Sequence, residues 1–412
     1  MLDNQRKLSN TFHLYHFISF LISIQAYLFS TFINSTATKW GFSFVEIGIL
    51  NFISSIAYAI ASITIGHLGD KFGYKKMLFI LFFYLNSVSI FGLFSKNTLT
   101  LYMFALTQGV FFGSFFPQVE GLIAKSETLI DIDPPSITGR FTLSWSTGNI
   151  IGVAFGPYLT VHARYFIFIL GLFISLLFVF IIHRDLQKNG EFIKFSPNNK
   201  LIKHQSNSLH KQFVGKVVQD KFLMKRFRLE YRIILFLGGL IYTSVLASFP
   251  KLITLAGIEL SKAGFLTVGA NIGVLLTFIT LQYWKKWVGN EKVSAVLLTV
   301  IPLTGLFSIF AKSSLVFFLT AFFAGCSYAI PYTFAIFYGL LSTNDEHGKQ
   351  GALHEMTIGL LFGFGPLVGG FFLDNFKNGL GLALLSLIVI IIVYFVQVYS
   401  SIHTKKLKVF KS

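Results

Sequence analysis

Charged residues are scarce in this chain. Asp, Glu, Lys and Arg make up 12% of its 412 residues, whereas hydrophobic residues make up 54% and the mean hydropathy is +0.68. Apolar runs of about twenty residues recur along the chain, and such a run can cross a bilayer as a helix. The chain lacks the ten-residue segments of alternating polarity that are typical of a transmembrane β-barrel. The sequence therefore predicts an all-α polytopic membrane protein.

Cysteine is almost absent as well. The single Cys326 excludes an intramolecular disulfide and leaves no cysteine pair for a structural metal site. We expect neither a bound metal nor a cofactor. The first apolar run is longer than the core of a secretory signal, and no small-residue cleavage pattern follows it. We therefore expect no cleavable signal peptide.

Motifs of several enzyme classes are also missing. No G-x-x-x-x-G-K-S/T loop occurs, which excludes an integral ATPase domain, and no G-x-S-x-G turn occurs. His354-Glu355 begins an H-E-x-x-H zinc-protease pattern, but Ile358 stands where the second histidine ligand belongs. The sequence therefore disfavours a membrane-embedded enzyme.

Basic residues exceed acidic ones, and the formal net charge is +17. The charges lie between apolar runs rather than on a soluble module, so we expect no nucleic-acid partner. Seven of the 34 basic residues fall on alternate connections that we take as external: Lys39, Lys96, Arg164, Lys251, Lys262, Lys312 and Lys377. The positive-inside rule then places both termini in the cytoplasm. We expect a monomeric, multi-pass protein of the plasma membrane.

Twelve apolar runs bounded by charges are the predicted transmembrane helices. They cover residues 13–36, 45–66, 77–95, 99–123, 139–161, 164–183, 232–256, 262–284, 293–311, 314–341, 350–373 and 379–402. We expect two six-helix bundles, residues 1–183 and 232–412, joined by a basic cytoplasmic linker at 184–231. Interleaved basic and apolar residues at 213–228 suit either an amphipathic helix on the inner leaflet or a solvated linker.

A glycine-rich, charged turn separates the second and third predicted helices. It resembles the signature loop of the major facilitator superfamily, usually written G-x-L-x-D-x-x-G-R/K-R/K, and the matching residues are Gly66, Leu68, Asp70, Gly73, Lys75 and Lys76. The resemblance implies two pseudo-symmetric bundles around a midplane cavity. It also implies that Asp70 faces the inner end of the eleventh helix, near Lys349, in the outward-open state. These residues are the predicted inner gate.

An internal repeat supports two related halves. Gly139-Arg140 precedes Gly156-Pro157 by the same spacing at which Gly348-Lys349 precedes Gly365-Pro366, with a constant offset of 209 residues. In the fifth helix, small residues recur every fourth position at Ser144, Gly148, Gly152 and Gly156, which predicts close helix packing. The segment resembles the G-x-x-x-G-P motif of proton-driven exporters, although two glycines that follow in that motif are absent here.

Few ionisable residues lie within the predicted helices, and a charge near the bilayer centre costs roughly 2.5–3.5 kcal/mol on insertion scales. Glu355, Glu120 and His354 stand out, with Arg140 as a partner for Glu120. They suit either a carboxylate that couples transport to H⁺ or Na⁺, with Glu355 as the leading candidate, or an interhelical ion pair that closes a gate. Ala105 stands where many proton-coupled relatives have an arginine, which disfavours the usual proton-coupling arrangement.

Uncharged polar and aromatic residues in mid-helix positions are candidates for substrate contacts. They are Gln25, Gln108, Trp145, Asn149, Asn271 and Tyr328. We expect a secondary active transporter that moves a small organic solute by alternating access. A cavity with few fixed charges suits a neutral, weakly polar or amphipathic solute better than a multiply charged anion. An exporter of hydrophobic or amphipathic compounds is the alternative within transport. A membrane-embedded enzyme or a receptor-like protein that does not transport is the alternative outside it.

Overall fold

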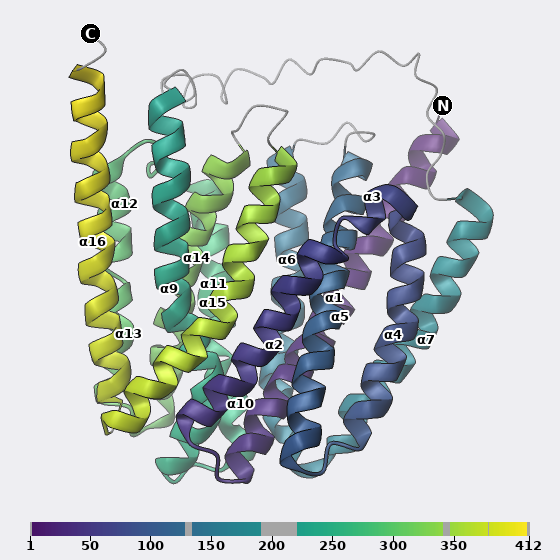
Figure 1. The fold of residues 1–412 in the computed structure, drawn as a ribbon, viewed down its shortest axis with the longest axis horizontal. Coiled ribbons are helices and arrows are strands. Elements are labelled where there is room, and N and C mark those ends of the chain that lie inside the picture. Colours follow the sequence, from purple (N-terminus) through teal and green to yellow (C-terminus); the bar gives the residue numbers. More distant parts are fainter. Residues whose placement is uncertain (1, 128–133, 191–220, 341–346, 378, 410–412) are drawn as a thin grey trace.

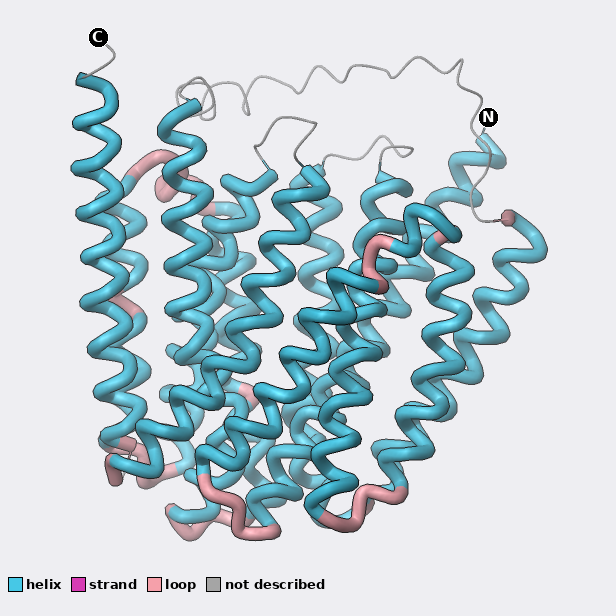
Figure 2. The backbone as a smooth tube through the Cα atoms, viewed as in Figure 1, coloured by secondary structure: helices cyan, strands magenta, loops and turns pink. Residues whose placement is uncertain are grey.

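The computed structural model describes residues 2–127, 134–190, 221–340, 347–377 and 379–409. It consists mainly of long helices whose axes are roughly parallel (Figure 1). The first half contains α1 (Leu2–Lys39), α2 (Phe44–Thr64), α3 (Leu68–Phe72), α4 (Tyr74–Leu93), α5 (Thr98–Glu127), α6 (Pro134–His162) and α7 (Arg164–Asn189). Short connections lie at both ends of the helices (Figure 2). We call the edge with residues 40–43 external, following the predicted orientation; both termini lie at the opposite edge (Figure 1).

The second half contains α9 (Lys221–Leu255), η1 (Leu260–Lys262), α10 (Ala263–Thr267), α11 (Gly269–Tyr283), α12 (Glu291–Leu298), α13 (Ile301–Ile309), α14 (Ser314–Leu340), α15 (His347–Asn375) and α16 (Leu380–Val409). Two predicted spans are each interrupted. One is divided between α10 and α11 at Val268. The other is divided between α12 and α13 next to Pro302, whose ring nitrogen cannot donate a helix hydrogen bond.

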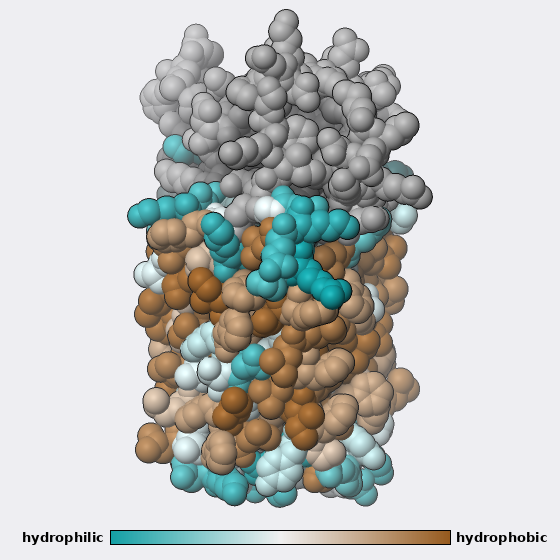
Figure 3. Space-filling view, turned by 90° about the vertical axis from the view of Figure 1, so that its right-hand side faces the viewer, coloured by the Kyte–Doolittle hydropathy of each residue, from teal (hydrophilic) through white to brown (hydrophobic). Residues whose placement is uncertain are grey.

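Eleven stretches of the described residues are long and apolar enough to cross a membrane. The remaining predicted span lies in α6, which has 29 residues but carries many Gly, Ser and Thr side chains. The face drawn in Figure 3 carries a broad brown apolar band, with hydrophilic residues above and below it. The predicted all-α membrane fold is confirmed.

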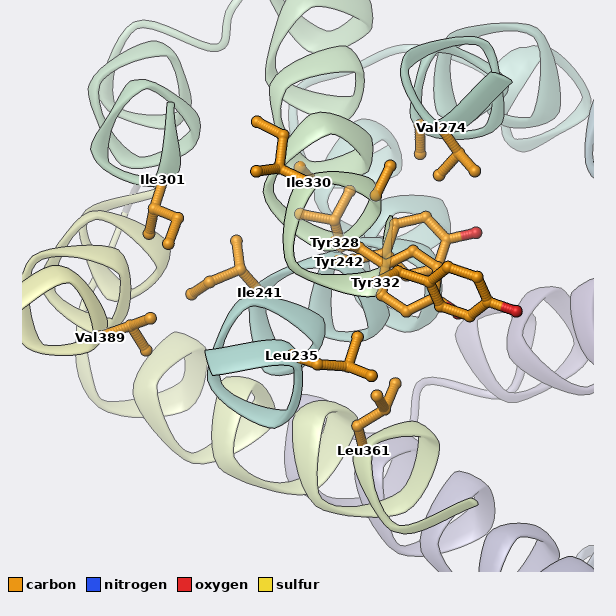
Figure 4. Packing of buried hydrophobic residues seen from close by; sticks show 14 of the residues in the cluster. Leu235, Ile241, Tyr242, Val274, Ile301, Tyr328, Ile330, Tyr332, Leu361 and Val389 are labelled. Atoms are coloured by element: carbon orange, nitrogen blue, oxygen red, sulfur yellow. The ribbon is translucent and has the colours of Figure 1, made fainter. Parts of the chain in front are cut away.

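Each half has an apolar core of its own. Buried side chains between Tyr15 and Ile182 form one cluster, and those between Phe227 and Val393 form the other, part of which is drawn in Figure 4. Only one buried residue of each cluster comes from the opposite half, Ala247 and Phe44 respectively. The domain limits stay a prediction, and α7 and α9 extend into the interval assigned to the linker.

The sequence repeat corresponds to a repeated helix contact. A methyl group added to Gly156 of α6 would lie 1.7 Å from Thr31 Oγ1 of α1, and one added to Gly365 of α15 would lie 1.9 Å from Thr243 Oγ1 of α9. Both glycines therefore permit a close approach that any larger residue would block. Each half repeats the same way of packing its fifth helix on its first.

At the edge opposite the external one, an ion pair ties helices together within each half. In the first half, Lys75 Nζ of α4 lies 2.6 Å from Asp185 of α7 and is buried. In the second half, the Arg226 guanidinium of α9 contacts Glu291 of α12 through two bonds of 2.9 and 2.8 Å. Arg226 also contacts the buried Glu230 at 3.1 Å. These contacts stiffen each half without joining it to the other.

Candidate functional site

A cavity of about 200 Å³ lies between the two halves. Residues of α1, α2, α5 and α6 line it from the first half, and residues of α14 and α15 line it from the second. At the external edge, α10 approaches α6 so closely that a methyl group on Gly264 would lie 2.3 Å from the carbonyl oxygen of Ala154. Helices from both halves therefore meet on the external side of the molecule.

Four of the six predicted substrate residues line the cavity: Gln108, Trp145, Asn149 and Tyr328. Their helical positions suit this because Trp145 and Asn149 are one turn apart and share a face of α6. Gln108 also donates a hydrogen bond from Nε2 to Ser54 Oγ of α2, at 2.9 Å. Whether these residues bind a solute stays a prediction at this stage.

The other two predicted substrate residues lie outside the cavity lining. Gln25 is fully buried between α1 and α7, where its Nε2 donates to the carbonyl oxygen of Ile167 at 3.0 Å. Asn271 is buried on α11 and accepts a hydrogen bond from Tyr242 at 3.1 Å. In this structure both side chains join neighbouring helices.

Two carboxylates from opposite halves, Glu120 of α5 and Glu355 of α15, line the same cavity. The Tyr58 hydroxyl of α2 donates a hydrogen bond to Glu355 Oε2 at 3.2 Å, so this bond spans the two halves. No Lys, Arg or His is among the described residues that line the cavity. The cavity thus carries two acidic groups without a basic one in its described lining.

Aromatic rings form much of the remaining wall. Trp145 packs against Tyr332 with ring centroids 6.3 Å apart, and Tyr328 stacks on Tyr242 at 4.7 Å. The Tyr27 and Tyr242 hydroxyls, which belong to opposite halves, lie 3.4 Å apart. Figure 4 shows the Tyr242, Tyr328 and Tyr332 rings grouped together between helices. A planar or cationic group inside the cavity would therefore face several π systems.

Sequence reasoning missed the part of the cavity that α2 contributes. Asn51, Ser55 and Tyr58 all line it. Their spacing of i, i+4 and i+7 places them on one helix face. This polar stripe in an apolar helix is the signal that could have identified them.

His354 and Arg140 complete the predicted coupling set. His354 is buried beside the Tyr332 ring, 4.9 Å away between centroids, and is not among the cavity-lining residues. Arg140 lies on α6, but its side chain is outside the described part of the chain. The role of neither residue is tested.

The predicted inner gate is described in part. Gly73 has a φ of 101° at the turn into α4, and a methyl group on Gly66 would lie 2.1 Å from the Ser62 carbonyl oxygen. The exposed Asp70 accepts a hydrogen bond from the Tyr74 hydroxyl at 2.6 Å. Lys76 is exposed, whereas the Lys349 side chain lies outside the described residues. The ion pair of Lys75 lies within the first half, and Asp185, its partner, was not foreseen.

The family model of the Major Facilitator Superfamily matches residues 15–344. The chain belongs to this superfamily. This identification confirms the resemblance of the loop at residues 66–76 and makes the protein a membrane transporter rather than an enzyme. Alternating access of a central site is typical of this fold.

Known proteins similar to this facilitator are transporters or are named for drug resistance. Multidrug resistance protein 1 of Bacillus subtilis (strain 168) is 27% identical over 342 residues, which cover 78% of each chain. Among solved structures, a mutant of the nucleoside transporter NupG has a TM-score of 0.67 at 14% identity, covering 94% of this chain and 98% of that one. A bacterial homologue of the human lysosomal transporter Spinster, in an inward-facing and occupied conformation, has a TM-score of 0.65 at 10% identity and coverages of 96% and 97%.

Proposed function

We propose that this facilitator is a secondary active transporter that exports amphipathic organic cations in exchange for protons. The observation that carries the proposal is the placing of Glu120 and Glu355, from opposite halves, on one aromatic-lined cavity. The proposal combines the predicted coupling role of these carboxylates with the predicted alternative of amphipathic export. It places the protein in the plasma membrane as a monomer with both termini in the cytoplasm.

The free-energy cost of burying a charge in the membrane supports exchange of the substrate for protons rather than transport of the substrate alone. An unneutralised charge in the membrane costs about 2.5–3.5 kcal/mol on insertion scales, so the cavity can reorient readily only when its carboxylates are neutralised. A proton can neutralise a carboxylate in the empty protein, and a cationic substrate can do so in the loaded one. Because each occupant displaces the other, substrate and proton move in opposite directions.

The wall of the cavity supports an amphipathic aromatic cation. Trp145, Tyr328 and Tyr332 line the cavity, and a cation that lies over the face of such a ring, within about 6 Å of its centroid, is attracted by the ring quadrupole. Gln108 and Asn149 add neutral polar groups that suit weakly polar substituents. We infer that these five residues contact the substrate, and that Gln25 and Asn271 do not.

The direction of transport is supported by two further observations. The relative from Bacillus subtilis is named for multidrug resistance. The glycine stripe of α6, which ends at Gly156-Pro157, resembles a motif of proton-driven exporters. Export of hydrophobic cations entering from the cytoplasmic leaflet is the function that fits both.

Glu355 is the leading coupling residue because the Tyr58 hydroxyl holds its carboxylate where the two halves meet. In this proposal Glu355 binds either a proton or the first positive charge of a substrate, and Glu120 takes a second charge. The structural alternative, a carboxylate that only closes a gate, would leave the coupling to protons unchanged when Glu355 is neutralised.

Proteoliposomes test the proposal with ethidium, a planar aromatic monocation. An acidic lumen should drive ethidium accumulation by the wild-type protein with the membrane potential clamped at zero. Glu355→Gln should lower this accumulation and flatten its dependence on pH, and the double variant with Glu120→Gln should abolish it. Glu259→Gln is the matched control because this carboxylate is exposed and pairs with Lys262 at the surface.

Undiminished, pH-dependent accumulation by the double variant would refute the role of both carboxylates. Accumulation that follows an imposed Na⁺ gradient and ignores pH would refute proton exchange. Failure of the wild-type protein to accumulate ethidium or any other lipophilic cation, combined with uptake of a neutral solute, would refute the substrate class.

A further inference from the structure

The first three backbone N–H groups of α2 find their acceptors in two different halves of the protein. An α-helix leaves these N–H groups without partners of its own, and they carry partial positive charge. Ser43 Oγ accepts from the Glu46 N–H at 3.1 Å, while Glu46 Oε2 accepts from the Ser43 N–H at 2.7 Å. This capping box lies wholly within the first half.

Asp374 supplies the remaining acceptors from the second half. It lies in the last turn of α15, and its carboxylate accepts from the Phe44 N–H at 3.1 Å and from the Val45 N–H at 2.8 Å. A carboxylate at a helix N-terminus is favoured both by hydrogen bonding and by the helix dipole. The residues concerned are 330 and 329 positions apart in the chain.

A second contact crosses between the halves beside the first. Lys251 of α9 donates a hydrogen bond from Nζ to the carbonyl oxygen of Phe42, and its Nζ lies 4.6 Å from the centroid of the Phe44 ring. Lys251 also interacts electrostatically with Asp374 and Glu46. Backbone packing is tight here, since a methyl group on Gly370 would lie 2.4 Å from the Phe44 carbonyl oxygen.

We propose that Asp374 and Lys251 form an external latch, which holds the two halves together when the transporter is closed to the outside. When α2 separates from α15 at this edge, the Phe44 and Val45 N–H groups lose the Asp374 carboxylate and hydrogen-bond to water instead. The N-terminus of α2 also loses the nearby negative charge of Asp374. The capping box moves with α2 and stays intact. The latch therefore favours one state of the transport cycle, whereas the capping box stabilises both states equally.

The position of the latch mirrors that of the family loop. Asp70 follows α2 at the cytoplasmic edge, where the family resemblance directs it at the start of α15. Asp374 ends α15 at the external edge, where it contacts the start of α2. Asp70 thus follows the end of α2 and suits the N-terminus of α15, whereas Asp374 ends α15 and contacts the N-terminus of α2. We infer that Asp70 favours the state closed to the cytoplasm and that Asp374 favours the state closed to the outside.

Accessibility of a cavity cysteine tests the latch without reference to any substrate. Ser30 lines the cavity on α1, so Ser30→Cys in a Cys326→Ala background provides one reactive site. A membrane-impermeant maleimide is applied to membrane vesicles of each orientation, and the ratio of external to cytoplasmic labelling rates is measured. Asp374→Asn should raise this ratio about fivefold, the effect of losing one solvent-exposed helix-capping interaction.

Two further variants separate the latch from simple damage to α2. Ser43→Ala removes an acceptor from the same helix end but belongs to the first half, so it should lower stability and leave the labelling ratio unchanged. Lys251→Gln should raise the ratio as Asp374→Asn does, and Asp374→Glu should restore it in part. A ratio unchanged in both Asp374→Asn and Lys251→Gln, or raised equally by Ser43→Ala, would overturn the proposal. A failure of proton coupling would leave this ratio untouched.

Discussion

The two cavity carboxylates predict a dependence of transport on substrate charge. A dication such as propidium would neutralise both Glu120 and Glu355, whereas ethidium would neutralise one and leave the other to a proton. The two probes share a phenanthridinium ring system, so their difference in charge is the main variable. Glu120→Gln leaves a single acidic group in the cavity. The charge of a monocation still balances that group, whereas a dication leaves one positive charge unbalanced.

The cost of that excess charge sets the size of the effect. About 2.5–3.5 kcal/mol per unneutralised charge in the membrane corresponds to a decrease in rate of roughly a hundredfold, at about 1.4 kcal/mol for each factor of ten. We therefore expect Glu120→Gln to lower the rate of propidium transport by about two orders of magnitude. Ethidium transport should stay within a few-fold of the wild-type rate.

Proteoliposomes with an acidic lumen and a clamped membrane potential provide the assay, with each dye followed by its fluorescence on internal DNA. Glu259→Gln should leave both rates unchanged, which controls for the loss of a surface carboxylate. Equal losses of ethidium and propidium transport in Glu120→Gln would show that the residue supports folding or reorientation rather than charge matching. Unchanged propidium transport would refute the reasoning altogether.

Two predictions concern stability and are measured by thermal unfolding of the purified protein. Arg226→Met should lower the free energy of unfolding by about 3–5 kcal/mol, because it leaves the buried carboxylate of Glu230 without its ion-pair partner. Glu291→Gln should lower it by about 1 kcal/mol or less, because the Glu291 side chain is 41% exposed. Equal losses in the two variants would contradict this ranking. Gly156→Ala should cost about 1–3 kcal/mol, since the added methyl group would overlap a threonine hydroxyl of α1. Gly359→Ala, whose nearest neighbours lie at 3.3 Å or more, should be tolerated, and a larger loss there than at Gly156 would refute the packing argument.

The sequence was sufficient to predict the membrane class, the all-helical fold and the family, and eleven of the twelve predicted spans are long and apolar enough in the described residues to cross a membrane. These properties depend on local length, hydropathy and short motifs, and the bilayer requires each span to satisfy its own backbone hydrogen bonds. The loop at residues 66–76 identified the family because its glycines and charges are adjacent in the chain. Even α6, whose polar residues lower its hydropathy, was predicted as a helix from its apolar run bounded by charges.

The cavity was predicted only in part. Trp145 and Asn149 were chosen because they share a helix face, and both line the cavity. Gln25 was chosen as an uncharged polar residue in a mid-helix position, yet it joins α1 to α7. Helical periodicity states which residues share a face, but the rotation of the helix in the bundle decides what that face meets.

Contacts between the halves were decided by the tertiary structure alone. Asp374 accepts hydrogen bonds from residues about 330 positions away, and nothing in its neighbouring sequence marks it as a cap for α2. Lys251 was counted only as a topology signal, yet it contacts Phe42 of the other half. The sequence by itself determines which segments enter the membrane, because that depends on each segment and the bilayer. Which helix ends meet depends on the packing of all the helices together, and so it appears only in the folded structure.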